Sequence, residues 1–221
     1  MGRIAILKSL ILSKLVYLWL LLPNPPDGII EEIQKSIFMF IWNKKNDRIN
    51  RKTATQNTEL GGIGIPNVEN YIKALKLSWV RKLVLSNHKW KRILISCNTF
   101  FEKVKSFGTD IPLGLFSNNK FWKDVFSAYS VFGRKTSINK LEQFMSEPLF
   151  YNPLFKINNT VIYFENWANK GIYFVKDLVN DQGSFLTFQN FVDKYELVEN
   201  NFLRFNGFIN VLNVVCENLI L

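Results

Sequence analysis

A cluster of lysine and arginine side chains after residue 43 is the part of this sequence best suited to chemistry. Five basic residues fall within nine positions, together with one acid, Asp47. They are Lys44, Lys45, Arg48, Arg51 and Lys52. Such side chains neutralise phosphates and release counterions, which is the sequence-independent part of nucleic-acid affinity. The cluster predicts contact with a nucleic-acid backbone, and the alternative is an ordinary solvated surface.

A second basic group follows on a predicted helix. The segment 73–92 contains seven basic residues and no acid. The members that we assign to the same interface are Lys73, Lys76, Arg81 and Lys82. Four aromatic residues lie among the basic ones and could stack on bases, namely Trp42, Tyr71, Trp79 and Trp90. Aromatic residues at these helical spacings are more often part of a core, and we expect that here.

The distribution of charge along the chain supports a localised anionic partner. Residues 1–95 carry 16 Lys and Arg and 6 Asp and Glu, a net charge of +10. Residues 96–221 carry 12 of each, a net charge of zero. An asymmetry between two parts of one chain indicates a nucleic acid or a membrane surface as partner.

Catalytic and metal-binding chemistry has little support. The chain has one histidine, His88, which lies among basic residues, and two cysteines, Cys97 and Cys216. These residues are too few for a zinc cluster, so we expect two reduced thiols and a surface or phosphate-adjacent histidine. The glycines of 62–67 lack the context of a dinucleotide loop, and the turn at 180–183 lacks the ligands of a calcium loop. We therefore predict no catalytic residue, no cofactor and no metal.

Two helices and the loop that follows them are expected to position the first basic cluster. An apolar helix over 4–22 ends at a proline-rich turn, after which Asp27 caps a second helix that runs to about Trp42. The predicted core stripe of the second helix is Ile30, Ile33, Ile37, Phe40 and Ile41. Residues 43–57 are expected to form a loop or short hairpin.

A glycine turn and a third helix complete the first part. Its glycines, Gly61, Gly62 and Gly64, permit backbone conformations that side chains forbid. Asn67 is the expected N-cap of a helix from Val68 to about residue 86. The predicted core stripe of this helix is Ile72, Leu75, Trp79 and Leu83.

The later part is rich in aromatic residues. Short helices are expected over 121–132 and 139–145, and Thr187 is expected to cap another. Two strands should meet at Asn158-Asn159, a dipeptide that tolerates the backbone of a tight hairpin turn. The predicted fold class is therefore mostly α, a helical bundle at 1–95 followed by a smaller α+β region with a short β-hairpin at 96–221.

The apolar helix over 4–22 raises the question of a membrane. Its length nearly matches a bilayer core, but Lys8 and Lys14 would each cost roughly 2.5–3.5 kcal/mol near the centre. We expect a buried helix, which argues against a membrane partner. Because the helix is apolar nearly all round, it is expected to need neighbours on most sides. A non-enzymatic helical scaffold or membrane-associated protein using this helix is the alternative to nucleic-acid binding.

Several short motifs occur in an order that resembles one family. They are the helix end and prolines at 15–26, the Phe-Ile-Trp-Asn at 40–43, the Gly-Gly-Ile-Gly-Ile-Pro-Asn at 61–67 and the Ala-Leu-Lys-Leu-Ser-Trp-Val at 74–80. This order resembles the region that follows the polymerase core in LINE-type (non-LTR) retrotransposon reverse transcriptases. Weaker matches lie at 148–153, 167–172, 177–178 and 183–186.

The resemblance implies a thumb at 1–95, which holds the primer-template duplex, and an extension at 96–221 implicated in binding the RNA of the transposable element. It also implies a catalytically incomplete C-terminal fragment, because the Asp-Asp pair that holds the polymerase metal ions is absent from the sequence. The family's endonuclease module and Cys/His knuckle are likewise absent from these residues. The expected partners are RNA or DNA backbone with weak sequence preference and the palm domain of the parent polyprotein. The expected location is intracellular, nuclear or cytoplasmic.

Overall fold

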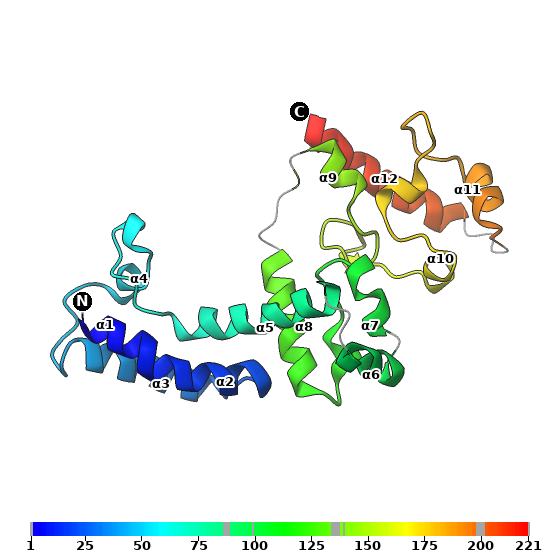
Figure 1. Cartoon of the computed structure of the whole chain (residues 1–221). Helices are drawn as coiled ribbons and strands as arrows, with labels where there is room; N and C mark the ends of the chain where they lie inside the picture. Colours follow the sequence, from blue (N-terminus) through cyan, green and yellow to red (C-terminus); the bar gives the residue numbers. More distant parts are fainter. Residues whose placement is uncertain are drawn as a thin grey trace. The chain divides into compact units, whose positions relative to one another are not determined.

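The structure is a computed structural model, and it is mostly helical with a short antiparallel hairpin (Figure 1). The predicted fold class is thus confirmed. The structure describes residues 2–85, 89–98, 100–133, 138, 140–197 and 202–220. Its contacts form two compact units, a first unit of Met1–Lys82 with Phe116–Ala128 and a second unit of Leu83–Leu115 with Tyr129–Leu221. This division reflects packing and says nothing of function. The predicted functional division after residue 95 therefore stays a prediction.

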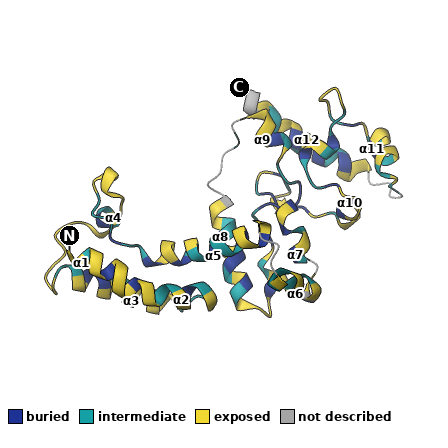
Figure 2. Ribbon diagram, in the orientation of Figure 1, coloured by how far each residue is buried: buried dark blue, intermediate teal, exposed yellow. Residues whose placement is uncertain are grey.

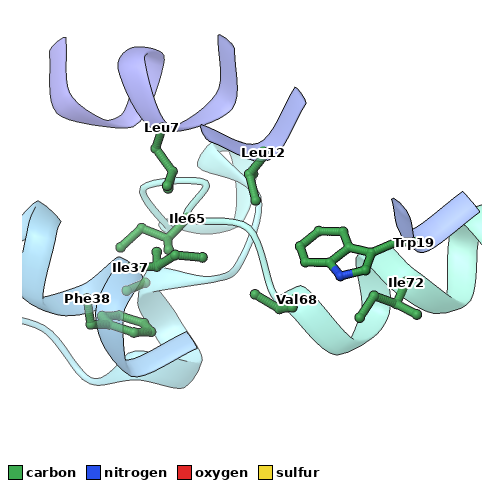
Figure 3. Packing of buried hydrophobic residues seen from close by; sticks show 9 residues of the cluster. Leu7, Leu12, Trp19, Ile37, Phe38, Ile65, Val68 and Ile72 are labelled. Carbon is green, nitrogen blue, oxygen red and sulfur yellow. The ribbon is translucent and has the colours of Figure 1, made fainter. Parts of the chain in front are cut away.

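The first unit opens with a continuous helical segment that contains a π turn. Helix α1 spans Gly2–Ile6, the π turn η1 spans Leu7–Leu12, and α2 spans Ser13–Leu21. On an ideal α-helix, positions five apart such as Leu7 and Leu12 would point about 140° apart. The π turn, which adds a residue to the turn, brings both into one core. Leu7 is 1% exposed and Leu12 is 3% exposed, and Figure 3 shows both pointing into the same cluster.

The N-terminal helix buries one face only. By length and composition, Gly2–Leu21 could cross a membrane, with a mean hydropathy of 1.9, and 17% of that window is buried. We expected this helix to have neighbours on most sides, and among the described residues it does not. The π turn gathers its core contacts on one side and leaves the other sides exposed. Figure 2 shows much of this helix exposed. Its exposed large apolar side chains are Ile6, Leu10, Ile11, Tyr17, Leu18 and Leu21.

Helix α3, Asp27–Ile41, is close to the prediction but differs in two details. Its N-cap is Pro26, one residue before the expected Asp27, and the Pro26 carbonyl accepts from the amides of Ile29 and Ile30. Phe40 is 37% exposed, whereas Phe38 is 1% exposed, so Phe40 was wrongly placed in the core stripe. Phe38 can be buried because a side chain from the following segment covers its ring, which the helical period alone does not reveal.

Helix α5, Val68–Leu85, begins at the predicted cap. The Asn67 side-chain oxygen accepts from the amide of Asn70 at 2.9 Å. Gln34 of α3 adds a link that was not predicted, because its Oε1 accepts from the Val68 amide at 2.8 Å and its Nε2 donates to the Pro66 carbonyl at 3.3 Å. The start of α5 is therefore fastened to the middle of α3.

Helix α8, Lys120–Gly133, confirms the helix expected over 121–132. Its first-unit residues carry aromatic rings: Phe121 lies edge-on to Trp79 at 5.5 Å, and Phe126 stacks on Phe116 at 4.5 Å. Segments far apart in the sequence thus share one aromatic core in the first unit.

The second unit is built from short helices and turns around aromatic side chains. Its elements are α6 (Lys89–Cys97), α7 (Phe100–Lys103), η3 (Val104–Ser106), α9 (Leu141–Met145), α10 (Glu165–Asn169), η5 (Val175–Leu178), α11 (Phe188–Tyr195) and α12 (Phe202–Ile220). The turn η4, Leu113–Phe116, lies where the two units meet in the sequence. Trp167 of α10 packs 4.8 Å from Phe191 of α11, and Phe191 lies 4.7 Å from Phe205 of α12. The predicted cap Thr187 accepts from the amide of Asn190 at 3.3 Å, as expected.

The predicted hairpin is present in the second unit. Strands β1, Lys156–Ile157, and β2, Thr160–Val161, pair antiparallel with Lys156 opposite Val161. The turn residues Asn158 and Asn159 have φ angles of 50° and 60°. Asparagine accepts this left-handed backbone more readily than most residues, which explains why the turn forms there.

Candidate nucleic-acid interface

The predicted basic cluster lies on a turn and one short helix, which we call the basic segment (residues 43–57). It contains α4, Arg51–Ala54, where a loop or hairpin was expected. The short helix forms because the Asn50 side chain caps it, accepting from the Lys52 amide at 2.9 Å. All five predicted side chains of the cluster are exposed: Lys44, Lys45, Arg48, Arg51 and Lys52.

Arg51 differs from the other four because it holds the segment to the core. Its Nε donates to the Asp47 carboxylate at 2.6 Å, and its guanidinium lies 4.8 Å from the centre of the Phe38 ring. The stacked guanidinium shields Phe38 while its charge is balanced by Asp47. The remaining four cations form no ion pair within 4 Å with any residue that the structure describes. We call these four, Lys44, Lys45, Arg48 and Lys52, the free cations.

The turn of Gly61–Gly64 anchors the far end of the basic segment. The amide of Gly62 donates to the Asn57 carbonyl at 3.0 Å, that of Gly64 to Gln56 at 3.2 Å and that of Ile65 to Ala54 at 3.1 Å. Gly61 and Gly64 have φ angles of 79° and 68°, as their predicted role requires. Gly62 serves a different purpose, since a Cβ there would lie 2.1 Å from the Gln56 carbonyl oxygen.

The hydrophobic core of the first unit also anchors the basic segment. Ala54 of α4 is fully buried in the hydrophobic cluster, and Ile65, which follows the glycine turn, is 1% exposed. Figure 3 shows Ile65 among the other side chains of this cluster. The cluster comprises Leu7, Leu12, Trp19, Ile37, Phe38, Ala54, Ile65, Val68 and Ile72. The basic segment is therefore fixed through α4 at its centre, while the free cations remain in solvent.

The predicted basic residues of α5 fall into different environments. Lys73 is half-buried and pairs with Glu69 at 2.5 Å, so its charge is partly balanced. Arg81 and Lys82 are exposed, and the Lys82 ammonium lies 4.5 Å from the Trp79 ring centre. At 1.5 Å per residue, Arg81 lies roughly 12 Å along the helix axis from Lys73. These three residues therefore form no compact cluster on α5.

Lys76 is the predicted site residue whose position excludes a role at the surface. Its side chain is fully buried, its Nζ donates to the Leu22 carbonyl, and the ammonium lies 4.4 Å from the Phe121 ring centre. Burial lowers the pKa of Lys76 from 10.5 to about 8, and the nearby Asp124 carboxylate acts in the opposite direction. A buried amine engaged in this way cannot reach a phosphate, so we leave Lys76 out of the interface.

The burial of Lys76 has a signal in the sequence. Position 76 lies four residues after Ile72 and three before Trp79, on the stripe that was predicted to face the core. The side-chain type suggested a surface, and the helical period suggested the interior. The period was the better guide because the turn after α2 offers Lys76 a carbonyl acceptor that satisfies its amine.

The buried amine predicts a specific pH dependence of stability. Between pH 8 and 10.5 the unfolded chain binds more protons at Lys76 than the folded chain does, so the free energy of unfolding should rise with pH across this window, by about 3 kcal/mol at most. Lys76→Met should remove this rise. Urea unfolding followed at several pH values from 7 to 10 would measure it. Lys73→Met is the matched control, and a rise that survives Lys76→Met would contradict the burial of the charge.

The aromatic residues near the basic groups are mostly used for packing. The indole nitrogen of Trp79 donates to the Leu20 carbonyl at 2.8 Å, and the Tyr71 ring lies 6.2 Å from Trp19 in an edge-on contact. Trp42 is half-buried against the hydrophobic cluster. These contacts agree with the expectation that such aromatics belong to the core, although Tyr71 keeps 38% of its surface exposed.

The other residues that were considered for chemistry are His88 and the cysteines. His88 lies outside the described residues, and so does the expected end of α5 at residue 86. Cys216 is a free, half-buried thiol. Within the described residues, no group of three or more His, Cys, Asp or Glu side chains is placed to hold a metal ion.

A search of this sequence against protein-family models found no match.

Proposed function

We propose that this chain binds the sugar-phosphate backbone of a nucleic acid through the basic segment. The observation that carries the proposal is the set of four free cations on one anchored turn. Unpaired cations in solvent can neutralise phosphates without first breaking an ion pair, so counterion release contributes fully to affinity. A turn that is already held by α4 and by the glycine turn loses little conformational freedom when it binds.

The proposed ligand is RNA or DNA with little sequence preference, because contacts to phosphates position a protein but do not read bases. The resemblance to the region after the polymerase core of LINE-type reverse transcriptases supports the same proposal. On that reading residues 1–95 are thumb-like, and the palm domain of the parent polyprotein is a further partner. The chain itself would not polymerise nucleotides, since its sequence holds no Asp-Asp pair.

One observation favours a second candidate function. The exposed apolar face of the N-terminal helix, Gly2–Leu21, would suit a scaffold or membrane-associated protein. Apolar association would not weaken as salt is added, whereas phosphate binding should weaken steeply. The two candidates therefore differ in a single measurable property.

A salt series tests the proposal directly. We expect the full chain to bind a labelled duplex in fluorescence anisotropy, with log K falling linearly as log salt rises from 50 to 300 mM. Four phosphate contacts would give a slope of about −3.6 on B-DNA. Liposomes of neutral lipid serve as the comparison, because their binding should not follow this slope. Absence of duplex binding at the lowest salt would refute the proposal.

A further inference from the structure

The second unit contains a hollow of about 620 Å³ whose lining is mainly polar and cationic. Its polar lining residues include Lys91 and Arg92 of α6, Lys103 at the end of α7, Lys105 and Ser106 of η3, and Tyr173. These residues come from segments up to 82 positions apart, so the fold creates the cluster. We call it the cationic hollow.

The charge of the cationic hollow is poorly balanced by the protein. Four cations line it with one acid, Glu102. None of the four forms an ion pair within 4 Å with a residue in the described ranges, and the Lys103 ammonium makes only a 3.3 Å hydrogen bond to the Asn169 side-chain oxygen. Like charges gathered in a concave surface repel one another and focus a positive potential, which an anion would relieve.

Two hydroxyl groups add neutral donors to the same hollow. Ser106 is 8% exposed, and neither its hydroxyl nor that of Tyr173 has a hydrogen-bond partner among the residues that the structure describes. Burial, aided by Glu102, raises the pKa of Tyr173 above its ordinary value, so its hydroxyl keeps the proton that it would donate. Ammonium, guanidinium and hydroxyl donors around one space are the groups that proteins use to hold phosphate oxygens.

We propose that the cationic hollow is a phosphate-binding site, separate from the basic segment. Its volume falls in the range of small-molecule sites and admits a group as large as a nucleotide. The planar Arg92 fork suits two oxygens of one phosphoryl group, and the three ammonium groups supply charge around it. The phosphoryl group comes from a nucleic-acid strand or from a free polyphosphate, and the two sources share this chemistry.

The test compares two variants of the full chain that lose the same charge. In the hollow variant, glutamine replaces the lysine or arginine at each of Lys91, Arg92, Lys103 and Lys105. In the control variant, glutamine replaces four lysines elsewhere in the second unit, Lys156, Lys170, Lys176 and Lys194. Inorganic tripolyphosphate is titrated into each protein by calorimetry, and a short single-stranded oligonucleotide is titrated in parallel.

We expect the hollow variant to bind at least one of the two probes tenfold or more weakly, and the control variant to change less than twofold. Loss for the oligonucleotide alone assigns the site to a nucleic-acid strand, loss for tripolyphosphate alone assigns it to a free polyphosphate, and loss for both assigns it to either source. Equal losses in both variants would show that net charge alone drives binding and would overturn the proposal. Unchanged binding of both probes would overturn it as well.

Tyr173→Phe provides a second, milder variant in case four substitutions disturb folding. It keeps the ring, which lies 6.4 Å from Phe150, and removes only the hydroxyl. We expect a threefold to tenfold loss of affinity for the probe that the site prefers, and no loss would count against the site. Because the basic segment is intact in these variants, failure here leaves the proposed function of the first unit open to its own test.

Discussion

Glutamine at all four free cations is expected to weaken duplex binding about 100-fold at 0.1 M salt, because each cation that is removed leaves one phosphate with its counterion still bound. The slope of log K against log salt should flatten by roughly one for each phosphate that is no longer neutralised. The substituted residues of this basic-segment variant are Lys44, Lys45, Arg48 and Lys52. Fluorescence anisotropy across a salt series measures both quantities at once.

Arg51 is left unchanged in this variant for a structural reason. Its guanidinium covers the Phe38 ring and pairs with Asp47, so its loss would disturb the core as well as the charge. The control removes four charges from the second unit, at Lys156, Lys170, Lys176 and Lys194. Equal weakening in the two variants would mean that net charge explains the binding, and an unchanged slope in the basic-segment variant would disprove a localised interface there.

Gly62→Ala is expected to destabilise the first unit by about 2–3 kcal/mol. The added Cβ would lie 2.1 Å from the Gln56 carbonyl oxygen and 2.8 Å from that of Thr53. Both are backbone atoms, so relief requires movement of the main chain, and overpacking of this kind typically costs about 1–3 kcal/mol. Urea unfolding followed by far-ultraviolet circular dichroism would measure the change.

Gly28→Ala is the matched control for the glycine turn. A Cβ at Gly28 meets no atom within 4 Å, and the residue lies in the first turn of α3, where alanine is favoured over glycine. We expect no loss of stability there and a gain of up to about 1 kcal/mol. If Gly62→Ala behaves like the control, the turn does not hold the end of the basic segment as described.

Elements with a strong local signal were predictable from the sequence. Asn67 and Thr187 cap helices because their side chains accept hydrogen bonds from amides three residues later, an interaction that needs no distant partner. The Asn158-Asn159 turn is likewise local. The mostly α fold class and the positions of the main helices follow from such signals and from the helical period.

Features that depend on distant partners were not predictable in the same way. Phe38 is buried beneath a guanidinium that lies beyond a turn. Lys76 is buried with its ammonium donating to the carbonyl of Leu22, the residue that follows α2. The cationic hollow was missed for a further reason. Lys103 and Lys105 belong to a stretch whose overall charge is zero, so composition conceals a local excess that appears only when α6 lies beside α7 and η3.

The π turn near the N-terminus has a consequence for any surface that meets the exposed side of this helix. One additional residue in a turn sets the angular position of every later side chain back by about 100° relative to an uninterrupted α-helix. Ile6 before the turn and Leu18 after it, which would lie about 120° apart around the axis of an uninterrupted α-helix, are therefore brought to the same side, where both are exposed. Deleting one residue from the π turn would rotate the apolar side chains after it by about 100° away from those before it, so a complementary surface would then meet only one of the two groups.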